Sequence, residues 1–496
     1  MSSQDIEHSM SQGGSPDAAM AARNRLVIGI LLISTFVMIL NETIMSVALP
    51  RLMHDLDVTA GAAQWLTTAF LLTMAVVIPI TGFLIQRFNT RPLFLISMGL
   101  FSVGTLLCAL APGLLSLVFG RVVQAAGTAI MMPLLMTTVM NLVPPQTRGR
   151  TMGNISIVIS VAPAIGPTIS GIILNVLDWR WMFWLVLPIA VTALVLGGRL
   201  IQNVTTPRIA PLDIVSVVLS AIGFGGLVYG LSSIGEAHGA EHIVPLWVPV
   251  AIGALGLALF IARQFKLQDL DRALLDLRTF KSKTFTLAIV MMAINMMALF
   301  GMIILFPIYT QNVLGMDALQ TGLMLLPGGL MMGLMAPFVG RWYDRVGPAP
   351  LVIPGSILVS AVLWSMTLLG ETTAIWLVLT GHMVLSVGLA LLFTPLFTAS
   401  LGALPARLYS HGSATLGTIQ QVSGAAGIAL LVSLMSLRMT VLSDQGATDV
   451  AALAGGIRMA FMCAAILSLG TIVAALFIRK TKDPDEMPVG AVATGH

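Results

Sequence analysis

The stretch GFLIQRFNTRP, residues 82–92, recurs in related form as GRWYDRVGPAP at residues 340–350. Each stretch begins with glycine, carries two arginines, has a proline near its end and lies between two long apolar segments. Arginine and lysine collect in the cytoplasmic loops of membrane proteins. The two stretches therefore indicate two equivalent cytoplasmic loops, and their recurrence predicts a chain built from two similar halves.

The composition indicates a membrane protein with little room for a soluble domain. The 496 residues are 57% hydrophobic and only 9% charged, and the mean hydropathy is +0.96. Soluble domains carry about 25% charged residues. The net charge of +4 is spread over loops, which does not indicate a nucleic-acid partner. The two cysteines, Cys108 and Cys463, lie in apolar segments, so we expect no disulfide framework and no metal site.

Apolar segments long enough to cross a bilayer run through the whole chain. A spanning helix needs about 20 such residues. The first segment is too long for a signal-peptide core and is expected to remain in the mature protein. We predict an all-α membrane protein with fourteen transmembrane helices, at residues 26–49, 62–85, 93–112, 115–142, 152–177, 181–200, 213–234, 245–263, 285–312, 319–340, 350–369, 373–398, 412–436 and 456–478.

The distribution of basic residues supports this count. With the N-terminus inside, twenty of the 25 lysines and arginines fall in cytoplasmic loops or tails. Only Arg51, Arg180, Arg438 and Arg458 fall outside, and Arg121 lies within a span. One missed or false span would destroy this asymmetry. We therefore expect both termini on the cytoplasmic side.

The repeated loops divide the chain into six parts. Parallel halves related by an axis along the membrane normal are a known transporter plan, with the substrate site between them near the midplane. The predicted parts are a disordered cytoplasmic tail (1–25), an N-terminal six-helix bundle (26–200), two inserted helices (213–263), a cytoplasmic amphipathic linker (264–284), a C-terminal six-helix bundle (285–478) and a cytoplasmic tail (479–496).

The linker is the one loop with a helical pattern of its own. Leu267, Leu270, Leu274 and Leu277 recur at helical spacing, and the opposite face is charged. This pattern predicts a short helix on the inner membrane surface. A plain cytoplasmic linker is the alternative.

Two ionisable side chains lie deep within predicted spans. Glu42 is the only carboxylic acid there, and Arg121 is the only arginine or lysine. Counted from the outer ends of their helices at 1.5 Å per residue, both lie roughly 12 Å below the outer surface. Charges at such depth usually face a bundle interior or a wet cavity. Their shared depth and opposite charge predict that they meet, directly or through Gln124 or water.

This pair has a structural interpretation and a functional one. A buried ion pair that only fixes helix packing is the first, although such pairs stabilise poorly compared with apolar replacements. The second is a proton site. Burial disfavours a charged carboxylate and a nearby arginine favours it, so Glu42 is placed to gain and lose a proton. A substrate that competes for the same cavity would displace that proton, which is antiport.

Six stretches, in chain order, resemble motifs of the major facilitator superfamily, in particular its fourteen-helix drug:proton antiporters. They are LNETIMSVALP (40–50), QWLTTAFLL (64–72), GFLIQRFNTRP (82–92), RVVQAAGTAIMMP (121–133), APAIGPTISG (162–171) and DWRWMFWLVLP (178–188). Five positions depart from the family pattern, namely Asn41 for Asp, Phe70 for Tyr, Gln86 for Asp, Asn89 for Gly and Ala125 for Gly. The triplet NET and residues 404–430 resemble the lincomycin-resistance type of exporter.

The resemblance implies a secondary transporter rather than an enzyme. It implies Glu42 as the carboxylate shared by proton and substrate, and Arg121 as its modulator. The acid lies one position after the family's usual aspartate, so it faces about 100° around the helix from Asn41. We expect no cofactor, a monomer driven by the proton gradient in the cytoplasmic membrane of a bacterium, and membrane lipids, protons and small amphipathic substrates as partners.

Further residues are expected to contact substrate or to shape the gates. Amides are favoured as contacts because a polar amide facing lipid is costly, and methionine suits adaptable surfaces. The candidate substrate contacts are Asn41, Trp65, Gln124, Met131, Met132, Asn295, Gln311, Gln420 and Gln421. The candidate gating or packing residues are Gly82, Arg87, Gly166, Pro167, Gly171, Asp344 and Arg345. Because Gln86 cannot carry the charge of Asp344, we expect asymmetric gates.

Other functions fit the sequence less well. An exporter of one endogenous metabolite or lipid would share every feature above. A channel, a membrane enzyme or a non-transporting sensor belongs to a different class. We find no metal cluster, nucleotide-binding loop or nucleophile constellation, and no ring of polar residues of the kind that lines a selectivity filter.

Overall fold

The computed structural model describes residues 16–58, 60–203, 207, 211–235, 245 and 247–478, and these residues form helices and short connections without strands. Fourteen helical segments in this part are long and apolar enough to span a membrane, which confirms the predicted count. In lipid, only a helix satisfies every backbone group of a single segment. The helices are α2 (Pro16–Asp55), α3 (Ala60–Arg87), α4 (Thr90–Ala109), α5 (Leu114–Leu142), α6 (Arg148–Val176), α7 (Trp181–Leu200), α8 (Ile214–Ser220), α9 (Gly226–Gly235), α10 (Trp247–Gln268), α11 (Lys283–Asn312), α12 (Ala318–Val346), α13 (Ala349–Met366), α14 (Ile375–Gly402), α15 (Tyr409–Asp444) and α16 (Asp449–Phe477).

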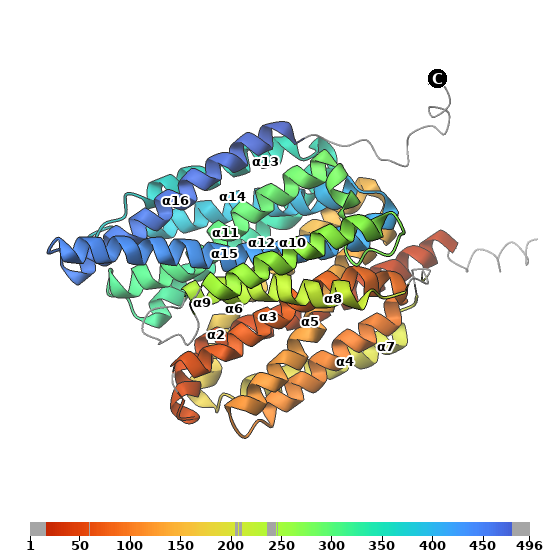
Figure 1. Ribbon diagram of the computed structural model, residues 1–496, viewed down its shortest axis with the longest axis horizontal. Coiled ribbons are helices and arrows are strands. Elements are labelled where there is room, and N and C mark those ends of the chain that lie inside the picture. The colour runs from red at the N-terminus through yellow and green to blue at the C-terminus, as the bar shows by residue number, and fades with distance from the viewer. Residues whose placement is uncertain are drawn as a thin grey trace, which may run out of the picture.

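The helices form two six-helix halves with an inserted pair between them. In Figure 1, α2–α7 lie below α11–α16, and α8, α9 and α10 cross the middle of the view. A π-helical turn (η2, Ala221–Gly225) joins α8 to α9, so the two form one span. The two related loops form the same short connection, between α3 and α4 and between α12 and α13. Gly347 has a φ of +80° there, a conformation that favours glycine.

The first helix begins earlier than predicted. Residues 16–25 were expected to belong to a disordered tail, but they are helical and form the first turns of α2. Pro16 opens the helix, and the segment that follows is rich in alanine, the strongest helix former. The predicted tails 1–15 and 479–496 lie outside the described residues.

The inserted pair packs on both halves. Along its own interface, Gly223 and Gly226 of one span face Gly256 and Gly253 of the other, where an added Cβ would collide with backbone atoms. Small residues allow this close approach of two membrane helices. A hydrophobic cluster then joins the pair to α3 and α15, and it contains Ala75, Phe83, Phe224, Val228, Phe260, Leu274, Leu275, Ala414 and Ala425. The inserted helices therefore bridge the two halves.

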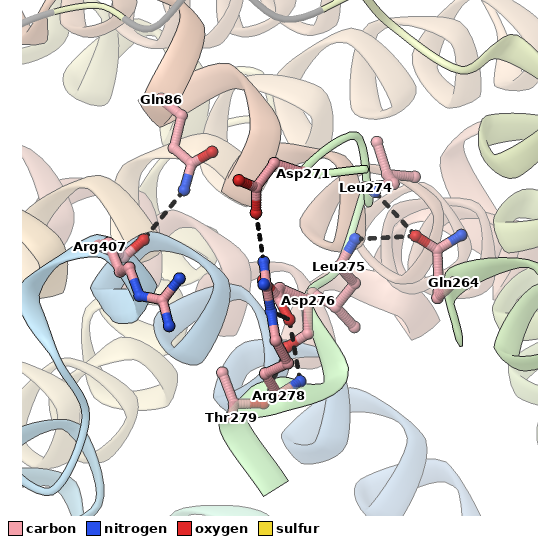
Figure 2. Close-up of polar contacts among 9 residues, drawn as sticks. All are labelled: Gln86, Gln264, Asp271, Leu274, Leu275, Asp276, Arg278, Thr279 and Arg407. Carbon is pink, nitrogen blue, oxygen red and sulfur yellow. Dashed lines mark hydrogen bonds and ion pairs between the residues drawn. The ribbon is translucent and has the colours of Figure 1, made fainter. Parts of the chain in front are cut away.

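The predicted amphipathic helix of the linker is absent. Helix α10 continues to Gln268, and after it only a 3₁₀ turn forms, at Leu277–Lys281. Leu274 and Leu275 are buried in the protein rather than turned to a membrane surface. The cause is the buried side chain of Gln264, whose Oε1 accepts hydrogen bonds from the backbone N–H groups of these two leucines, at 2.8 and 3.3 Å (Figure 2).

An ion pair orders the inner end of the inserted helices. Asp213 caps α8 and accepts two hydrogen bonds from Arg263 of α10, both at 2.7 Å. The Ser216 hydroxyl donates to the same carboxylate and accepts from Gln264. The chain of contacts therefore runs from the start of α8 to the linker.

The hydrogen bonds that we find between the two halves lie at the end predicted to be cytoplasmic. The Gln86 amide donates to the Arg407 carbonyl at 3.2 Å (Figure 2). Farther along the same interface, two pairs of hydroxyl groups are joined at 2.8 and 2.9 Å, Thr137 with Ser413 and Ser156 with Thr394. This end of the molecule is therefore closed.

Asp344 forms the charged contact of this closed end. Its carboxylate, at the end of α12, accepts hydrogen bonds from the backbone N–H groups of Gly149 and Arg150, at 2.7 and 2.8 Å. These groups open α6, where the helix dipole favours a negative charge. Gly340 and Gly149 allow the two helices to approach at this point, because an added Cβ would collide with backbone atoms. The equivalent residue of the first half, Gln86, makes a neutral contact instead.

We predict that Asp344→Asn opens the inner end more than Gln86→Ala does. Hydrogen bonds to a charged group contribute about 1.5–3 kcal/mol, and neutral ones about 0.5–1.5 kcal/mol. Spin labels at the exposed residues Phe88 and Val346 report the separation by double electron–electron resonance. A longer distance is expected in Asp344→Asn than in Gln86→Ala. Equal distance distributions in Asp344→Asn and the unsubstituted protein would contradict the assignment.

We also predict that Asp213→Asn destabilises the protein equally at pH 6 and pH 8. The Arg263 hydrogen bonds hold the pKa of Asp213 well below its usual range. A carboxylate whose folded pKa is depressed adds stability above its unfolded pKa of about 3.9, and that stability is lost only as the pH falls through the lower folded value. Thermal unfolding at both pH values tests this, with Asp269→Asn as the exposed control. A loss confined to one of these pH values would contradict the prediction.

Candidate functional site

Arg121 is the centre of a polar cluster within the first half. Its side chain is 1% exposed. Nη1 donates to Gln124 Oε1 at 2.8 Å and to Asn41 Oδ1 at 3.2 Å, and Nε donates to the Leu66 carbonyl at 3.5 Å. The guanidinium carbon lies 4.1 Å from the centre of the Phe70 ring. The positive charge is thus held by neutral acceptors from α2, α3 and α5.

Gln124 is fixed in turn by α4. Its Nε2 donates to Thr105 Oγ1 at 2.8 Å, and the Thr105 hydroxyl donates to the Phe101 carbonyl of its own helix. Helices α4 and α5 approach closely because Gly104 has no side chain, and a Cβ there would collide with the Gln124 backbone. Arg121 and Gln124 lie three residues apart, so they share one helix face. The packing of α4 therefore determines where the guanidinium points.

Glu42 lies at the depth of this cluster but is not bonded to it. Its neighbour Asn41 faces Arg121, and Glu42 lies about 100° farther around the helix. Glu42 and Arg121 were predicted to meet directly or through Gln124 or water. No direct hydrogen bond joins them in the described part of the chain, although Arg121 is near enough to act on Glu42 electrostatically. Asn41 makes the hydrogen bond in its place.

The face of α2 that carries Glu42 points into the protein. Ile33 is 59% exposed, and nine residues separate it from Glu42. At 100° per residue this separation places the two side chains on opposite sides of the helix. Glu42 itself is half-buried. The carboxylate therefore does not face the outer surface that Ile33 faces.

The neighbours of Glu42 fix its orientation. Thr43 packs on α6 at Gly166, where a Cβ would collide with the threonine side chain, and its hydroxyl lies 3.5 Å from the Ala162 carbonyl. Asn41 packs on α5 through Arg121. With contacts on both sides, α2 cannot rotate freely about its axis. The helix face that carries Glu42 is therefore fixed beside the Arg121 guanidinium.

The remaining predicted substrate contacts are spread over several environments. Trp65 is 44% exposed and stacks on Tyr229 of the inserted helix α9, with ring centroids 5.9 Å apart. Met131 is buried in the hydrophobic core, and the buried Asn295 donates to the Met291 carbonyl of its own helix at 2.7 Å.

Four further predicted contacts are more accessible than Met131 and Asn295. Met132, Gln420 and Gln421 are half-buried, and Gln311 is exposed in the last turn of α11. No hydrogen bond joins any of the four to Arg121 in the described part of the chain. Only Asn41 and Gln124 of the predicted contacts belong to the cluster.

The predicted packing residues of α6 behave differently from one another. Gly166 makes the close contact with Thr43, but no atom lies within 4 Å of a Cβ built on Gly171. The tight contact expected at Gly171 is therefore not seen. Pro167 lies within α6, and its side chain is outside the described part.

The predicted gating residues divide into contacts and exposed charges. Gly82 packs on α15, where a Cβ would lie 3.3 Å from Ser410 O and Ala414 Cβ. Asp344 forms the carboxylate contact with α6. Arg87 and Arg345 are exposed. Of the predicted gating residues, one glycine and one carboxylate thus contribute contacts to the closed end, whereas the two arginines lie at the surface.

Sequence reasoning missed Thr105, which supports the cluster through Gln124, and Tyr229, which stacks on Trp65. Thr105 had a signal, because Ser97, Gly104, Thr105 and Cys108 recur at helical spacing and place small residues along one face of α4. Tyr229 had none, because the stacking on Trp65 depends on how the inserted pair docks. Among the described residues no group of three His, Cys, Asp or Glu side chains is arranged to hold a metal ion.

Comparisons with solved structures agree with the architecture. The human organic anion transporter MFSD10 has a TM-score of 0.63 at 15% identity, over 91% of this chain and 99% of its own. The proton:xylose symporter XylE also has a TM-score of 0.63 at 15% identity, over 93% and 97%. At such low identity the likeness concerns the fold alone.

Sequence relatives are much closer. The chain is 42% identical to an uncharacterized MFS-type transporter, YcnB, of Bacillus subtilis over 93% of this chain and 96% of that protein. It is 40% identical to the lincomycin resistance protein LmrB of Listeria monocytogenes over 92% and 97%. The family model of the Major Facilitator Superfamily matches residues 31–428. With this match, the fourteen spans and the paired halves, the chain belongs to the major facilitator superfamily.

Proposed function

We propose that this protein is a proton-coupled antiporter that exports amphipathic drugs from the cytoplasm. The observation that carries the proposal is the position of Glu42. It is an acid deep in a membrane helix, half-buried on the protein side of that helix, and it lies beside Arg121 without a hydrogen bond to it. Its carboxylate therefore lacks the hydrogen bond that would close an ion pair with Arg121, and this supports it as the group that binds the proton and the substrate.

The relatives support export of drugs. Three of them, at 39–40% identity, are named lincomycin resistance proteins. A more distant one, at 30% identity, is named a multidrug resistance protein B homolog of Mycobacterium tuberculosis. We therefore propose small amphipathic antibiotics as the substrate class and lincomycin as the first compound to test.

The proposed cycle begins with the inner end closed, as described above. Glu42 takes a proton from the outer side, and the loss of its negative charge weakens the hold on the substrate, which leaves. The contacts of Asp344 and Gln86 then break and the inner end opens. A substrate molecule enters from the cytoplasm and displaces the proton from Glu42. The proton and the substrate each shift the population toward the conformation to which they bind more tightly.

Arg121 has a modulating role in this cycle. Neutral acceptors hold its charge in place, beside Glu42 and without a hydrogen bond to it. A substrate competes with a proton only if the carboxylate is neither locked in the charged form nor permanently neutral. Asn41 supports this balance by occupying the hydrogen bond that would otherwise lock Glu42 to Arg121.

The energy source of the proposed cycle is the proton gradient, with no cofactor. Each charge that crosses the membrane gains about 2.3 kcal/mol per 100 mV, and each pH unit adds about 1.4 kcal/mol. We place the protein as a monomer among the lipids of a bacterial cytoplasmic membrane, with both termini on the cytoplasmic side. Export of one endogenous metabolite or lipid by the same cycle is the second candidate, because the fold and the carboxylate would serve it equally.

We predict that Glu42→Gln abolishes uphill efflux and preserves substrate binding. The amide keeps the size of the side chain but takes up no proton, so the gradient no longer drives the cycle. In everted vesicles energised with a proton gradient, lincomycin accumulation should fall at least about tenfold, since removal of coupling leaves only downhill exchange. Binding of lincomycin to the purified variant should remain measurable.

The matched control is Glu371→Gln, which changes an exposed acid outside the spans. This variant should transport like the unsubstituted protein. Undiminished uphill efflux in Glu42→Gln would contradict the proposed function. Loss of expression of Glu42→Gln alone would favour the structural interpretation of the pair, and altered ion permeability would favour a channel.

A further inference from the structure

The two halves place His382 where Arg121 lies in the first half. Arg121 is the eighth residue of α5, and His382 is the eighth residue of α14. Each follows a glycine, and each precedes another glycine by six positions, Gly127 and Gly388. The agreement continues beyond the helices, because a 3₁₀ turn begins 24 residues after each, and α6 and α15 begin 27 residues after each. The register of the two halves is thus the same over this region.

The surroundings of His382 are mostly apolar. Its Nε2 lies 3.2 Å from the Leu325 carbonyl of α12, which can only accept a hydrogen bond. The proton of the neutral ring therefore lies on Nε2. Nδ1 is buried and has no hydrogen-bond partner. The Phe306 ring of α11 lies over the imidazole, with ring centroids 5.2 Å apart.

A glycine lies beside His382 where a phenylalanine ring lies beside Arg121, and this difference gives the imidazole its space. An aromatic ring of α3, Phe70, lies under Arg121. On α12, Gly328 lies against His382, and a Cβ there would collide with the imidazole and with Ser386. Helix α12 therefore approaches the Nε2–Cδ2 edge of the ring through backbone atoms, and a separation of α12 from α14 would break the Nε2 hydrogen bond and expose that edge.

No acid faces this histidine from the helices around it. Helix α13 has no ionisable side chain, and α11 has Lys283 at its start and Tyr309, whose hydroxyl donates to the Gly370 carbonyl. The ionisable groups of α12 lie near its cytoplasmic end, at Arg341, Tyr343, Asp344 and Arg345. Those of α6 lie in its first turn, at Arg148 and Arg150, and those of α15 lie within two turns of its ends, at Tyr409, His411, Arg438 and Asp444.

We propose that His382 is a second proton-binding group of the transport cycle, located in the C-terminal half at the position equivalent to Arg121. The assignment rests on the proposed proton-coupled function. Nδ1 takes a proton from water and returns it to water, and no other bond is made or broken. In the closed packing the ring is neutral, because a second N–H group, on Nδ1, would be buried without an acceptor among the described residues.

Protonation of His382 is therefore tied to conformation. The ring gains a proton when α12 and α14 separate enough to admit water around the imidazole, and it must lose that proton before the two helices close on it again. At this depth the first half has a permanent cation, Arg121, whereas His382 of the second half is a cation only while it is protonated. The repeated architecture thus supports two different electrostatic roles at one level of the membrane.

Nuclear magnetic resonance of the full-length protein in lipid nanodiscs tests this directly. With histidine labelled at ¹³Cε1, the signal that disappears in His382→Gln is that of His382, and His382→Asn gives the same assignment if the glutamine variant does not fold. We expect the signal to titrate between pH 5 and 8.5, and to shift when lincomycin is added. A signal that does not move over this range, with or without lincomycin, overturns the proposal.

Transport provides the second measurement. Lincomycin efflux in everted vesicles should depend less on pH in His382→Gln than in the unsubstituted protein. The slope of the logarithm of the efflux rate against pH should be smaller by about one or more. Ser386→Ala is the control, because its hydroxyl donates only to the His382 carbonyl, at 2.9 Å, and its pH profile should be unchanged. A His382→Gln profile equal to that of the unsubstituted protein overturns the proposal. If Glu42→Gln keeps uphill efflux, the antiport function fails, while the titration of His382 is still decided by its own resonance.

Discussion

A guanidinium buried within a membrane protein must find acceptors, and the first half of this protein is arranged around that requirement. Arg121 collects a side-chain carbonyl from α2, a backbone carbonyl from α3 and an amide from its own helix. Removing a charge from water costs several kcal/mol unless such partners are present. The close packing of α4 on α5 at Gly104 and the direction of Asn41 are both consequences of meeting this cost.

The environment of Glu42 follows from the way in which Arg121 is hydrogen-bonded. Since neutral groups already satisfy Arg121, the carboxylate is attracted by the positive charge but is not held by it. A closed ion pair would be a poor coupling device, because a proton would have to break it at every turnover. Because the acid lies one residue after the family's usual position, Asn41 rather than a carboxylate accepts the hydrogen bond from Arg121.

The sequence predicted the parts of the fold that depend on length, charge and repetition. Apolar segments of about 20 residues and arginine-rich loops located fourteen spans and two halves. Predictions that needed tertiary contacts were less successful. The leucine spacing of 267–277 fits a surface helix. The backbone N–H groups of Leu274 and Leu275 instead donate hydrogen bonds to the Gln264 side chain of α10. The hydrogen bond of Arg121 to Asn41 rather than Glu42 was equally hidden, because adjacent polar residues on a helix differ only in direction.

The inserted helices make the molecule unequal on its two flanks. Helix α9 packs on α15, and the turn η2 packs on α3, so the seam between these two helices is covered on its bilayer side. The symmetry-related seam, between α6 and α12, has no inserted helix of its own. A hydrophobic compound dissolved in the lipid leaflet would therefore meet the inserted helices on one flank and the α6–α12 seam itself on the other. The inserted span therefore breaks the two-fold likeness of the halves at the surface that a compound dissolved in the bilayer would approach.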